Sequence, residues 1–412
     1  MKSWLTISDH SDFSIYNLPF GSFSTPNLDQ RLGVAIGDFI VDLKSCAQMG
    51  LFQQAPFAVV TLEEPILNNF MGCGKDARVW LRNWLQQQLT QTDSELFAHQ
   101  AQLLCPMESA ILHLPVSIGD YTDFYSSEDH ARNVGKMFRD PENALLPNWK
   151  HLPVGYHGRA SSIVVSGTNI HRPKIQFLPA GSEIPSFGPS KMIDFELEMA
   201  FLVSKNTNLG EQITTDEAED SIFGLVVFND WSARDTQRWE YVPLGPFLAK
   251  NFGSVISPWI VTMEALAPFR VAGPIQEPKV LPYLEYRQNM HFDVNLEVHL
   301  QPENGNEELI SKSNFKFMYW NMAQQLAHHT VNGCNVRIGD MMASGTISGP
   351  TPDSFGSMLE LAWGGKNPIT LKDGSTRASI QDGDTVIMRG FAEKDGIRVG
   401  FGECKSKILP AI

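Results

Sequence analysis

The pattern of apolar and polar residues predicts a chain that is mainly β. Residues 31–37 and 39–43 are two strand-like stretches joined at a Gly-Asp turn, which indicates a hairpin in a small β-rich unit. Farther along, alternating or continuous apolar runs predict strands at 161–166, 194–203, 222–228, 255–262, 290–300, 357–363 and 384–391. Glycine and proline are frequent between these runs. We therefore expect an α+β protein in which strands dominate.

Helical spacing is clearest in two regions. Residues 62–104 are rich in Gln, Glu, Leu and Ala, and their apolar positions at helical intervals are Val79, Trp80, Trp84 and Leu89. A second helix is expected from about residue 315 to 331, with Asn314 as its N-cap and Gly333 just past its end. The region beyond residue 115 should therefore contain few helices.

Length and composition favour a globular protein with two domains. At 412 residues the chain exceeds the roughly 250–300 residues at which a single core stops growing. Its 42% hydrophobic and 19% charged residues are ordinary for a globular protein. The character of the chain changes around residues 106–115. We therefore predict an N-terminal domain at 1–115 and a C-terminal domain at 116–412.

Charge and cysteine usage limit the expected partners and compartment. A net charge of -14 without a basic cluster argues against binding to nucleic acid or to an anionic membrane surface. The chain shows neither the apolar core of a signal peptide nor a run of about 20 apolar residues. Its five cysteines are dispersed, which is typical of reduced thiols. We expect a cytoplasmic protein.

Residues 194–203 carry the most informative acidic pattern. They alternate acidic and apolar residues before becoming fully apolar, which is typical of a strand. Alternate side chains of a strand share a face, so Glu196 should lie beside Glu198. Asp230 follows the apolar run 222–228 and adds a further carboxylate. Hard oxygen ligands in this number favour a bound Ca²⁺ or Mg²⁺, whereas an exposed acidic strand edge is the alternative.

A second segment rich in polar and titratable residues begins at Asp123. If its backbone is extended, Asp123 and Tyr125 share a face. Ser126 stands where the N-cap of a capping box would be, which places His130 in the first turn of a helix. The positive end of the helix dipole disfavours protonation there, so His130 is a candidate general base. An ordinary histidine on a surface helix is the alternative.

A polar helix is expected directly after the 222–228 run. If it begins at Asp230 or Ser232 and ends before Pro243, one face carries Asp230, Arg234, Gln237 and Tyr241. A cation, an amide and a phenol suit an oxyanion or a substrate carboxylate, although an ordinary polar face is equally compatible with this spacing. Lys250, in a loop farther along, is a weaker candidate by itself.

Six stretches of the chain are more specific as signatures of a protein family than the motif formed by Glu196 and Glu198. They are 119–127, 146–149, 151–162, 229–235, 239–248 and 343–349. Together they resemble the fumarylacetoacetate hydrolase (fumarylacetoacetase) family, and the resemblance covers nearly the whole chain. It implies a small N-terminal SH3-like β-barrel and a large C-terminal β-rich fold of the fumarylacetoacetase type. It also implies a homodimer.

The resemblance further implies two metal sites. By motif, an active-site Ca²⁺, which Mg²⁺ could replace, falls on Asp123, Glu196, Glu198 and Asp230. A second, structural Mg²⁺ falls on Asp230, Lys250 and Ser254, and the lysine is expected to take part through its carbonyl. The family carries threonine at the last of these positions, and serine keeps the hydroxyl.

The activity implied by the resemblance is hydrolysis of a carbon–carbon bond in a diketo-diacid, 4-fumarylacetoacetate, to fumarate and acetoacetate. His130 falls on the family's general base and Glu360, expected on a strand, on the acid that orients it. The oxyanion donors fall on Arg234, Gln237 and Lys250. The substrate-binding positions are Tyr125, Arg139, Tyr156, Gln237, Tyr241 and Thr346.

Two other interpretations stay open at this stage. Another acylpyruvate hydrolase of the superfamily, or a 2-oxo-acid decarboxylase, hydratase or isomerase, would share the metal carboxylates but usually lack the N-terminal domain. A non-catalytic, metal-stabilised module could also bind acidic metabolites. Turnover that is lost on chelation of the metal would separate an enzyme from such a module.

Overall fold

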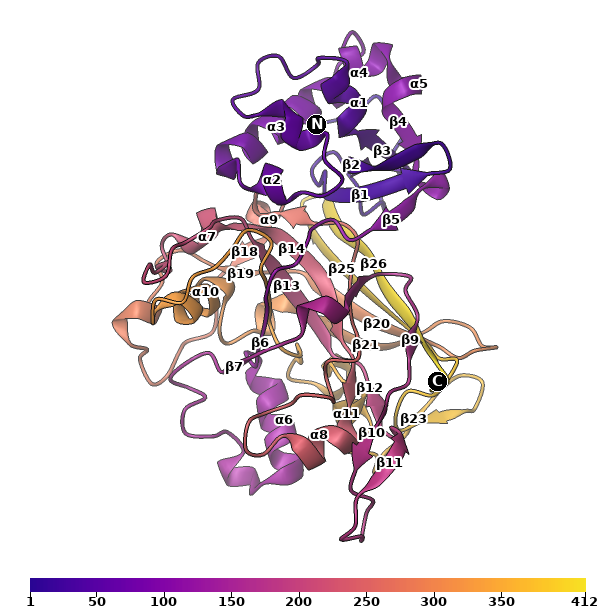
Figure 1. The fold of residues 1–412 in the computed structure, drawn as a ribbon, viewed down its shortest axis with the longest axis vertical. Coiled ribbons are helices and arrows are strands. Elements are labelled where there is room, and N and C mark those ends of the chain that lie inside the picture. The colour runs from indigo at the N-terminus through magenta and orange to yellow at the C-terminus, as the bar shows by residue number, and fades with distance from the viewer.

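The computed structural model describes residues 1–412 and confirms a mainly β chain with a smaller share of helices. The N-terminal part, in indigo, lies at one end of the molecule, and the rest of the chain forms the larger body below it (Figure 1). No helix combines the length and the apolar character that crossing a membrane would require.

A five-stranded antiparallel sheet organises the N-terminal part. In spatial order its strands are β4 (Leu104–Pro106), β3 (Phe39–Asp42), β2 (Leu28–Ile36), β1 (Phe20–Thr25) and β5 (Ile111–His113). β2 and β3 form the predicted hairpin, and Gly37 adopts a positive φ of 56° in its turn. Closure of this sheet into an SH3-like barrel stays a prediction.

The helical segment of the N-terminal part is centred on α3 (Gly74–Thr90). Its buried residues Leu81, Leu85 and Leu89 recur at four-residue intervals, as on one face of a helix. Trp80 and Trp84, which the sequence pattern singled out, are half-buried and pack against the apolar cluster that contains these three leucines. The other helices of this part are α1 (Leu43–Gln48), α2 (Asn68–Met71), α4 (Glu95–Ala98) and α5 (Gln100–Leu103).

An eight-stranded sheet forms the centre of the C-terminal part. Its strands follow the order β7 (Gly155–His157), β6 (Tyr121–Phe124), β22 (Met341–Ala343), β13 (Leu197–Val203), β14 (Ile222–Asp230), β16 (Ser254–Ile256) and β8 (Ile163–Val165), and β17 (Val261–Thr262) pairs with β14. Every residue of β13 and β14 is buried. This explains their nearly continuous apolar sequences, because both faces of the sheet are covered.

A second sheet of five strands packs against the first. Its order is β21 (Glu308–Asn314), β20 (Asn295–Gln301), β25 (Thr385–Lys394), β26 (Ile397–Leu409) and β9 (Ile170–His171). Side chains of both sheets, such as Val227 and Met388, belong to one cluster of 48 buried apolar residues. β26 was not predicted from the sequence, because its lysines and two glycines obscure the strand pattern.

Shorter elements complete the C-terminal part. The two-stranded pairs are β10 (Lys174–Phe177) with β11 (Ser186–Pro189), β12 (Ile193–Asp194) with β15 (Ser232–Ala233), β18 (Arg270–Val271) with β19 (His291–Phe292), and β23 (Ile369–Thr370) with β24 (Thr376–Arg377). The helices are α6 (Glu128–Phe138), α7 (Ala218–Ser221), α8 (Arg234–Glu240), α9 (Met263–Leu266), α10 (Met322–Thr330) and α11 (Met358–Leu361). α6 and α8 lie at the end of the molecule away from the N-terminal part (Figure 1).

Two predicted elements near the C-terminus were wrong. The single helix expected at 315–331 is a 3₁₀ turn at Phe315–Phe317 followed by α10. The reason is a second cap, because Asn314 accepts a hydrogen bond from Lys316 N and Asn321 accepts one from Gln324 N. The strand expected at 357–363 is instead the short helix α11, whose N-cap is Ser357.

Apolar and charged contacts join the N-terminal part to the central sheet. Phe20 and Phe70 pack against Phe223 of β14, with ring centroids 5.5 and 6.2 Å apart. The buried Arg78 of α3 forms an ion pair of 2.8 Å with Glu264 of α9. The division of the chain into domains 1–115 and 116–412 stays a prediction, and these contacts cross it.

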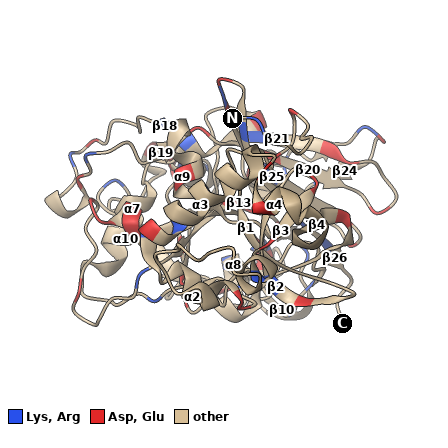
Figure 2. Ribbon diagram, turned by 90° about the horizontal axis from the view of Figure 1, so that it is seen from above, with Lys and Arg blue, Asp and Glu red and all other residues tan.

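Charged residues are spread over the molecule rather than gathered by sign. Seen from the N-terminal end, lysine and arginine lie among aspartate and glutamate (Figure 2). Several form ion pairs at the surface, such as Lys75 with Asp220 at 2.6 Å. The expected absence of nucleic-acid and membrane partners stays a prediction.

Candidate active site

Four acidic side chains converge within the central sheet. Carboxylate oxygens of Asp123, Glu196, Glu198 and Asp230 lie within 4.8 Å of one another, and all four residues are buried. Asp123 lies on β6, Glu198 on β13 and Asp230 at the end of β14. β22 pairs with both β6 and β13, and β13 pairs with β14, so the sheet order brings these positions together.

Glu196 occupies a break between β12 and β13 rather than a continuous strand. Its backbone forms an isolated bridge with Ser357, and Leu197 N donates to Gly356 O at 2.8 Å. Glu196 and Glu198 nevertheless reach the same cluster, as the two-residue period of extended chain predicts. The sequence pattern therefore found the right side chains while overstating the length of the strand.

Burial and mutual repulsion make the acid cluster a candidate metal site. Burial raises the pKa of Asp123, as does the nearby Asp230 carboxylate, and burial and Asp123 raise the pKa of Glu198. Asp123 Oδ1 and Glu198 Oε1 are buried without a hydrogen-bond partner. Buried oxygens of this kind are costly unless a cation satisfies them. The donor set therefore fits a hard divalent ion such as Ca²⁺ or Mg²⁺.

Two buried cations pair with the other oxygens of the cluster. Lys250 Nζ donates to Asp230 Oδ2 at 2.7 Å and also to Glu196 Oε2, whereas Arg234 Nη1 lies 2.7 Å from Glu196 Oε1. Burial alone would raise the pKa of Glu196, but Lys250 and Arg234 hold it below its ordinary value. Lys250 is thus a buried ammonium, although its loop position had made it a weak candidate.

Asp230 connects the acid cluster to two hydroxyl groups. Its Oδ1 accepts a hydrogen bond from Ser254 Oγ at 2.7 Å, and its Oδ2 accepts one from Tyr156 at 3.3 Å. Of the residues expected around a second ion, Asp230 therefore contacts both Lys250 and Ser254 directly. Lys250 meets Asp230 through its ammonium, whereas the sequence analysis expected a role for its carbonyl.

His130 and Glu360 form a buried pair. His130 Nδ1 lies 2.7 Å from Glu360 Oε2, and the two residues are 4% and 1% exposed. Burial alone would raise the pKa of Glu360, but the contact with His130 and hydrogen bonds from Asn133 and Ser348 hold it below its ordinary value. Because Glu360 occupies Nδ1, Nε2 is the ring nitrogen that remains for chemistry. The Tyr125 ring meets the imidazole edge to face at 5.3 Å.

The helix that carries His130 begins one residue later than expected. The N-cap of α6 is Ser127, whose side chain accepts from His130 N at 3.3 Å. The predicted cap, Ser126, is fully buried, and its hydroxyl instead accepts a hydrogen bond from Gln325 at 2.9 Å. His130 still lies in the first turn, as predicted, because the shift is only one residue.

The helix predicted to begin at Asp230 or Ser232 begins later, at Arg234. β14 includes Asp230, and a short strand, β15, separates it from α8. The four polar residues therefore do not form one helical face. Arg234 Nη1 donates to Gln237 Oε1 at 3.0 Å, whereas Tyr241 follows the last residue of α8 and is 53% exposed. Arg234 and Gln237 remain together because they lie three residues apart within α8.

Comparison with known proteins accounts for nearly the whole chain. The model of the fumarylacetoacetase N-terminal domain matches residues 16–115, and that of the fumarylacetoacetate (FAA) hydrolase C-terminal domain matches residues 120–409. The chain belongs to the fumarylacetoacetase family. It is 54% identical to the fumarylacetoacetase of Homo sapiens, with 100% of this chain and 99% of that protein covered. The fumarylacetoacetase of Arabidopsis thaliana is 48% identical, with the same coverage.

Solved structures support the same fold at much lower identity. A fumarylacetoacetate hydrolase from psychrophilic Exiguobacterium antarcticum matches with a TM-score of 0.55 and 17% identity, covering 95% of this chain and 99% of that one. Maleylpyruvate hydrolase from Sphingobium sp. SYK-6 matches with a TM-score of 0.51 and 13% identity, covering 96% of this chain and 100% of that one. At such identities the likeness concerns the fold alone.

The substrate-binding positions predicted for this member of the fumarylacetoacetase family lie in two kinds of surroundings. Tyr125 and Tyr156 are half-buried beside His130 and Asp230, and Thr346 is buried. Arg139 and Tyr241 are exposed. Arg139 follows α6 directly, and its Nη2 donates to Ala144 O at 2.8 Å. These two residues therefore lie outside the buried cluster.

Sequence reasoning missed the residues that hold the others in place. Asn133 and Ser348 donate to Glu360 at 2.9 and 2.8 Å. Asp194 pairs with Arg234 and accepts hydrogen bonds at the start of α11. A signal existed only for Asn133, which lies one helical turn after His130. Asp194 opens the acidic motif, but nothing in the motif separates its role from those of Glu196 and Glu198.

Proposed function

We propose that this protein hydrolyses 4-fumarylacetoacetate to fumarate and acetoacetate, the last step of tyrosine and phenylalanine catabolism. The observation that carries the proposal is the likeness to fumarylacetoacetases, at 54% identity over the full chain for the human protein. The His130–Glu360 pair beside a buried acid cluster is the arrangement that such a reaction requires. The family resemblance noted from the sequence predicted the same activity.

In the proposed reaction, His130 is the general base. Glu360 keeps the imidazole in one orientation, so that Nε2 takes a proton from water. The water oxygen bonds to the carbonyl carbon that becomes the new carboxylate of fumarate. The bond from that carbon to the neighbouring methylene then breaks, and its electron pair leaves with the acetoacetate fragment, which takes up a proton. Both products therefore form without a covalent enzyme intermediate.

Other side chains of the chain stabilise charge and bind the substrate. Arg234, Gln237 and Lys250 are assigned to the developing oxyanion, and the buried Arg234 Nη2, which has no partner, supports this role for the arginine. The residues assigned to substrate binding are Tyr125, Arg139, Tyr156, Gln237, Tyr241 and Thr346. The positive charge of Arg139 suits a terminal carboxylate of a dianionic substrate.

Metal ions complete the proposal. Ca²⁺, with Mg²⁺ as a substitute, is assigned to Asp123, Glu196, Glu198 and Asp230, and a structural Mg²⁺ to Asp230, Lys250 and Ser254. When bound, the active-site ion would polarise the attacked carbonyl and delocalise the charge of the departing enolate. The unpaired oxygens of Asp123 and Glu198 support the first assignment.

We also infer a cytoplasmic homodimer. Large apolar side chains are exposed on the segment around the end of α8, namely Trp239, Val242, Leu244, Phe247 and Leu248. A group of exposed apolar residues of this kind supports an interface between copies of the chain. None of the five cysteines is paired, which supports a reducing compartment.

The proposal is tested by the loss of fumarylacetoacetate absorbance, with both products identified. The expected result is turnover that disappears on chelation and returns with Ca²⁺ or Mg²⁺. Turnover of acylpyruvates alone would indicate another hydrolase of the superfamily, and release of CO₂ from a 2-oxo acid would indicate a decarboxylase. Binding of diketo-diacids without any turnover would indicate a metabolite-binding module.

A further inference from the structure

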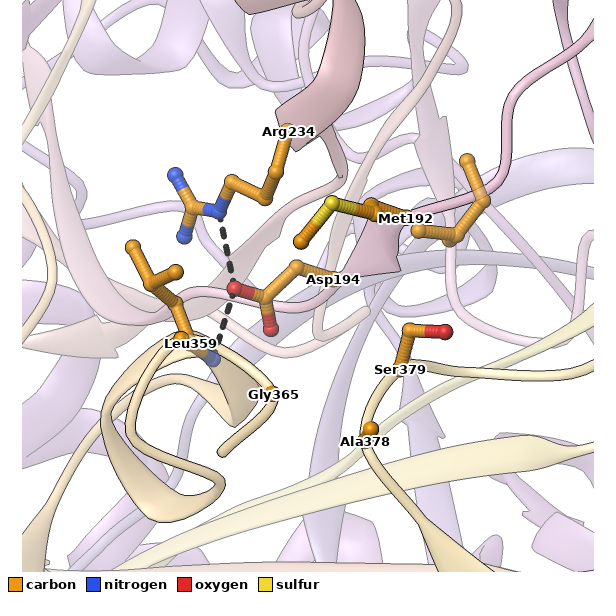
Figure 3. Close-up of a pocket in the computed structure, with 9 residues that line it drawn as sticks. Met192, Asp194, Arg234, Leu359, Gly365, Ala378 and Ser379 are labelled. Atoms are coloured by element: carbon orange, nitrogen blue, oxygen red, sulfur yellow. Dashed lines mark hydrogen bonds and ion pairs between the residues drawn. The ribbon is translucent and has the colours of Figure 1, made fainter. Parts of the chain in front are cut away.

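The Asp194 carboxylate contacts two separate parts of the candidate active site. It is buried, at 2% exposure, and its Oδ2 accepts hydrogen bonds from Arg234 Nε at 2.8 Å and from Leu359 N at 3.0 Å. Figure 3 shows both bonds meeting at that one oxygen. Its Oδ1 accepts a third bond, from Met358 N at 2.7 Å. Asp194 itself does not belong to the acid cluster.

The first contact sets the direction of the Arg234 guanidinium. Asp194 holds Nε, while Nη1 meets Glu196 at 2.7 Å and Gln237 at 3.0 Å. Nη2 is buried and is the nitrogen left without a partner. The backbone supports this arrangement, because Asp194 pairs with Ser232 just before α8. A guanidinium is a rigid planar fork, so fixing Nε and Nη1 also fixes Nη2.

The second contact builds the start of α11. Asp194 accepts from the first two amides of this helix, at Met358 and Leu359, and Ser357 Oγ accepts from the third, at Glu360. A helix of only four residues is not stable by itself, so these bonds determine where it begins. Glu360, the partner of His130, is the residue that follows Leu359.

We propose that Asp194 is a positioning residue that fixes Arg234 and Glu360 relative to each other. This inference rests on the proposed function, in which Arg234 stabilises the oxyanion and Glu360 orients the base. A single carboxylate thereby positions both the glutamate that orients the general base, His130, and the arginine that stabilises the developing oxyanion. Such groups must keep their separation closely, because a displacement of about 1 Å can cost roughly 10²-fold in rate.

Asp194→Asn is the main test, because it keeps the side-chain volume and one acceptor oxygen. The expected result is a fall in kcat of about 10²-fold with KM changed less than about threefold. Asp194→Glu, which keeps the charge but displaces the carboxylate, should lower kcat as well. If either variant folds and keeps the wild-type kcat, the proposal is overturned.

Asp42→Asn is a matched control in the N-terminal part. Asp42 is also 2% exposed, pairs with Arg31 at 3.1 Å and accepts an amide hydrogen bond from Ser45 at the start of α1. This variant should lose thermal stability comparably to Asp194→Asn while keeping its kcat. An equal loss of kcat in both variants would mean that Asp194 acts only through stability.

Chemical rescue supplies a readout that general destabilisation would not change. In Arg234→Ala, added guanidinium ion should restore part of the activity, because Asp194 offers it a binding site. In Arg234→Ala/Asp194→Asn the same ion should restore at least about tenfold less. An equal response of the two variants would overturn the proposal. Failure of the proposed function would instead appear as a wild-type protein that does not hydrolyse fumarylacetoacetate.

Discussion

His130 Nδ1 and Glu360 Oε2 lie 2.7 Å apart, although 230 residues separate them in the chain. Both side chains are buried, and Glu360 also accepts hydrogen bonds from Asn133, Ser348 and Ser357. With so many donors directed at it, the Glu360 carboxylate has little freedom to turn. The fixed Glu360 carboxylate therefore sets the orientation of the His130 imidazole.

The first prediction concerns this pair. His130→Ala should lower kcat by about 10²–10⁴-fold, the range of a positioned general base. If Glu360 acts only by orienting His130, adding Glu360→Gln to that variant should cost little more. The four kcat values of the double-mutant cycle check this, with metal affinity measured throughout as a control. Effects that multiply across the cycle would give Glu360 an independent role.

A second prediction concerns Glu198. Glu198→Ala should abolish activity and weaken Ca²⁺ binding by at least about tenfold, because one carboxylate is removed from the proposed cage. The metal-free variant should be no less stable than the metal-free wild type, because burial and repulsion from Asp123 both raise the pKa of Glu198 and the change removes both costs. Calorimetric titration with Ca²⁺ measures the first effect and thermal unfolding the second. Wild-type affinity would contradict the assignment.

A third prediction concerns Arg139, which directly follows the helix of His130. Arg139→Leu should raise KM by roughly tenfold or more while changing kcat less, because a guanidinium suited to a terminal carboxylate is lost. Steady-state kinetics with the dianionic substrate provide the test. Arg132→Leu is the matched control, because Arg132 is exposed on the same helix and pairs with Glu128 at 2.7 Å. An unchanged KM in Arg139→Leu would exclude the proposed contact.

A fourth prediction concerns His291, which lies outside the candidate site. Burial lowers the pKa of His291 from 6.5 to about 4, and its Nε2 lies 3.0 Å from Met318 O. In the unfolded chain, His291 therefore binds a proton below pH 6.5, whereas in the folded protein it binds one only below about pH 4. Its contribution to stability is complete above pH 6.5 and is lost as the pH falls toward 4.

Denaturant unfolding at a series of pH values checks this contribution. The histidine accounts for at most about 3.5 kcal/mol of the acid-dependent loss, at about 1.4 kcal/mol per pKa unit. His291→Gln keeps a donor for Met318 O and should flatten the slope between pH 6.5 and 4. His10→Gln, at an exposed position, should leave the slope unchanged. The same slope in both variants would mean that other groups cause the acid sensitivity.

The central strands and the acid cluster could be predicted from the sequence for a physical reason. β13 and β14 are buried along their whole length, and a strand that is covered on both faces is apolar at nearly every position. Glu198 and Asp230 stand out against that background because charged residues are rarely buried without a role. The His130 helix was similarly marked by its capping pattern, although the cap proved to be Ser127.

Other parts of the fold and the candidate site depend on contacts between distant residues, which no local sequence pattern indicates. α11 has too few residues to show a helical period, and Asp194, distant in sequence, determines its start. Nothing in its local sequence distinguishes Lys250 from an ordinary loop lysine, but the fold places it between Glu196 and Asp230. Asn321 forms a second cap that the local sequence does not mark. One continuous helix was therefore predicted where the chain forms a 3₁₀ turn and then the separate helix α10. In each case, tertiary contacts override the local signal.

The position of β22 has a consequence for the order in which the protein can fold. β22 lies between β6 and β13, and it is parallel to the first and antiparallel to the second. On the ribosome, both of those strands keep an unpaired edge until residue 343 has been made. Open strand edges are sites of aggregation, and distant pairings slow folding. A nascent chain of this protein should therefore need protection, for example by a chaperone, from residue 124, where β6 ends, until residue 343 has been made.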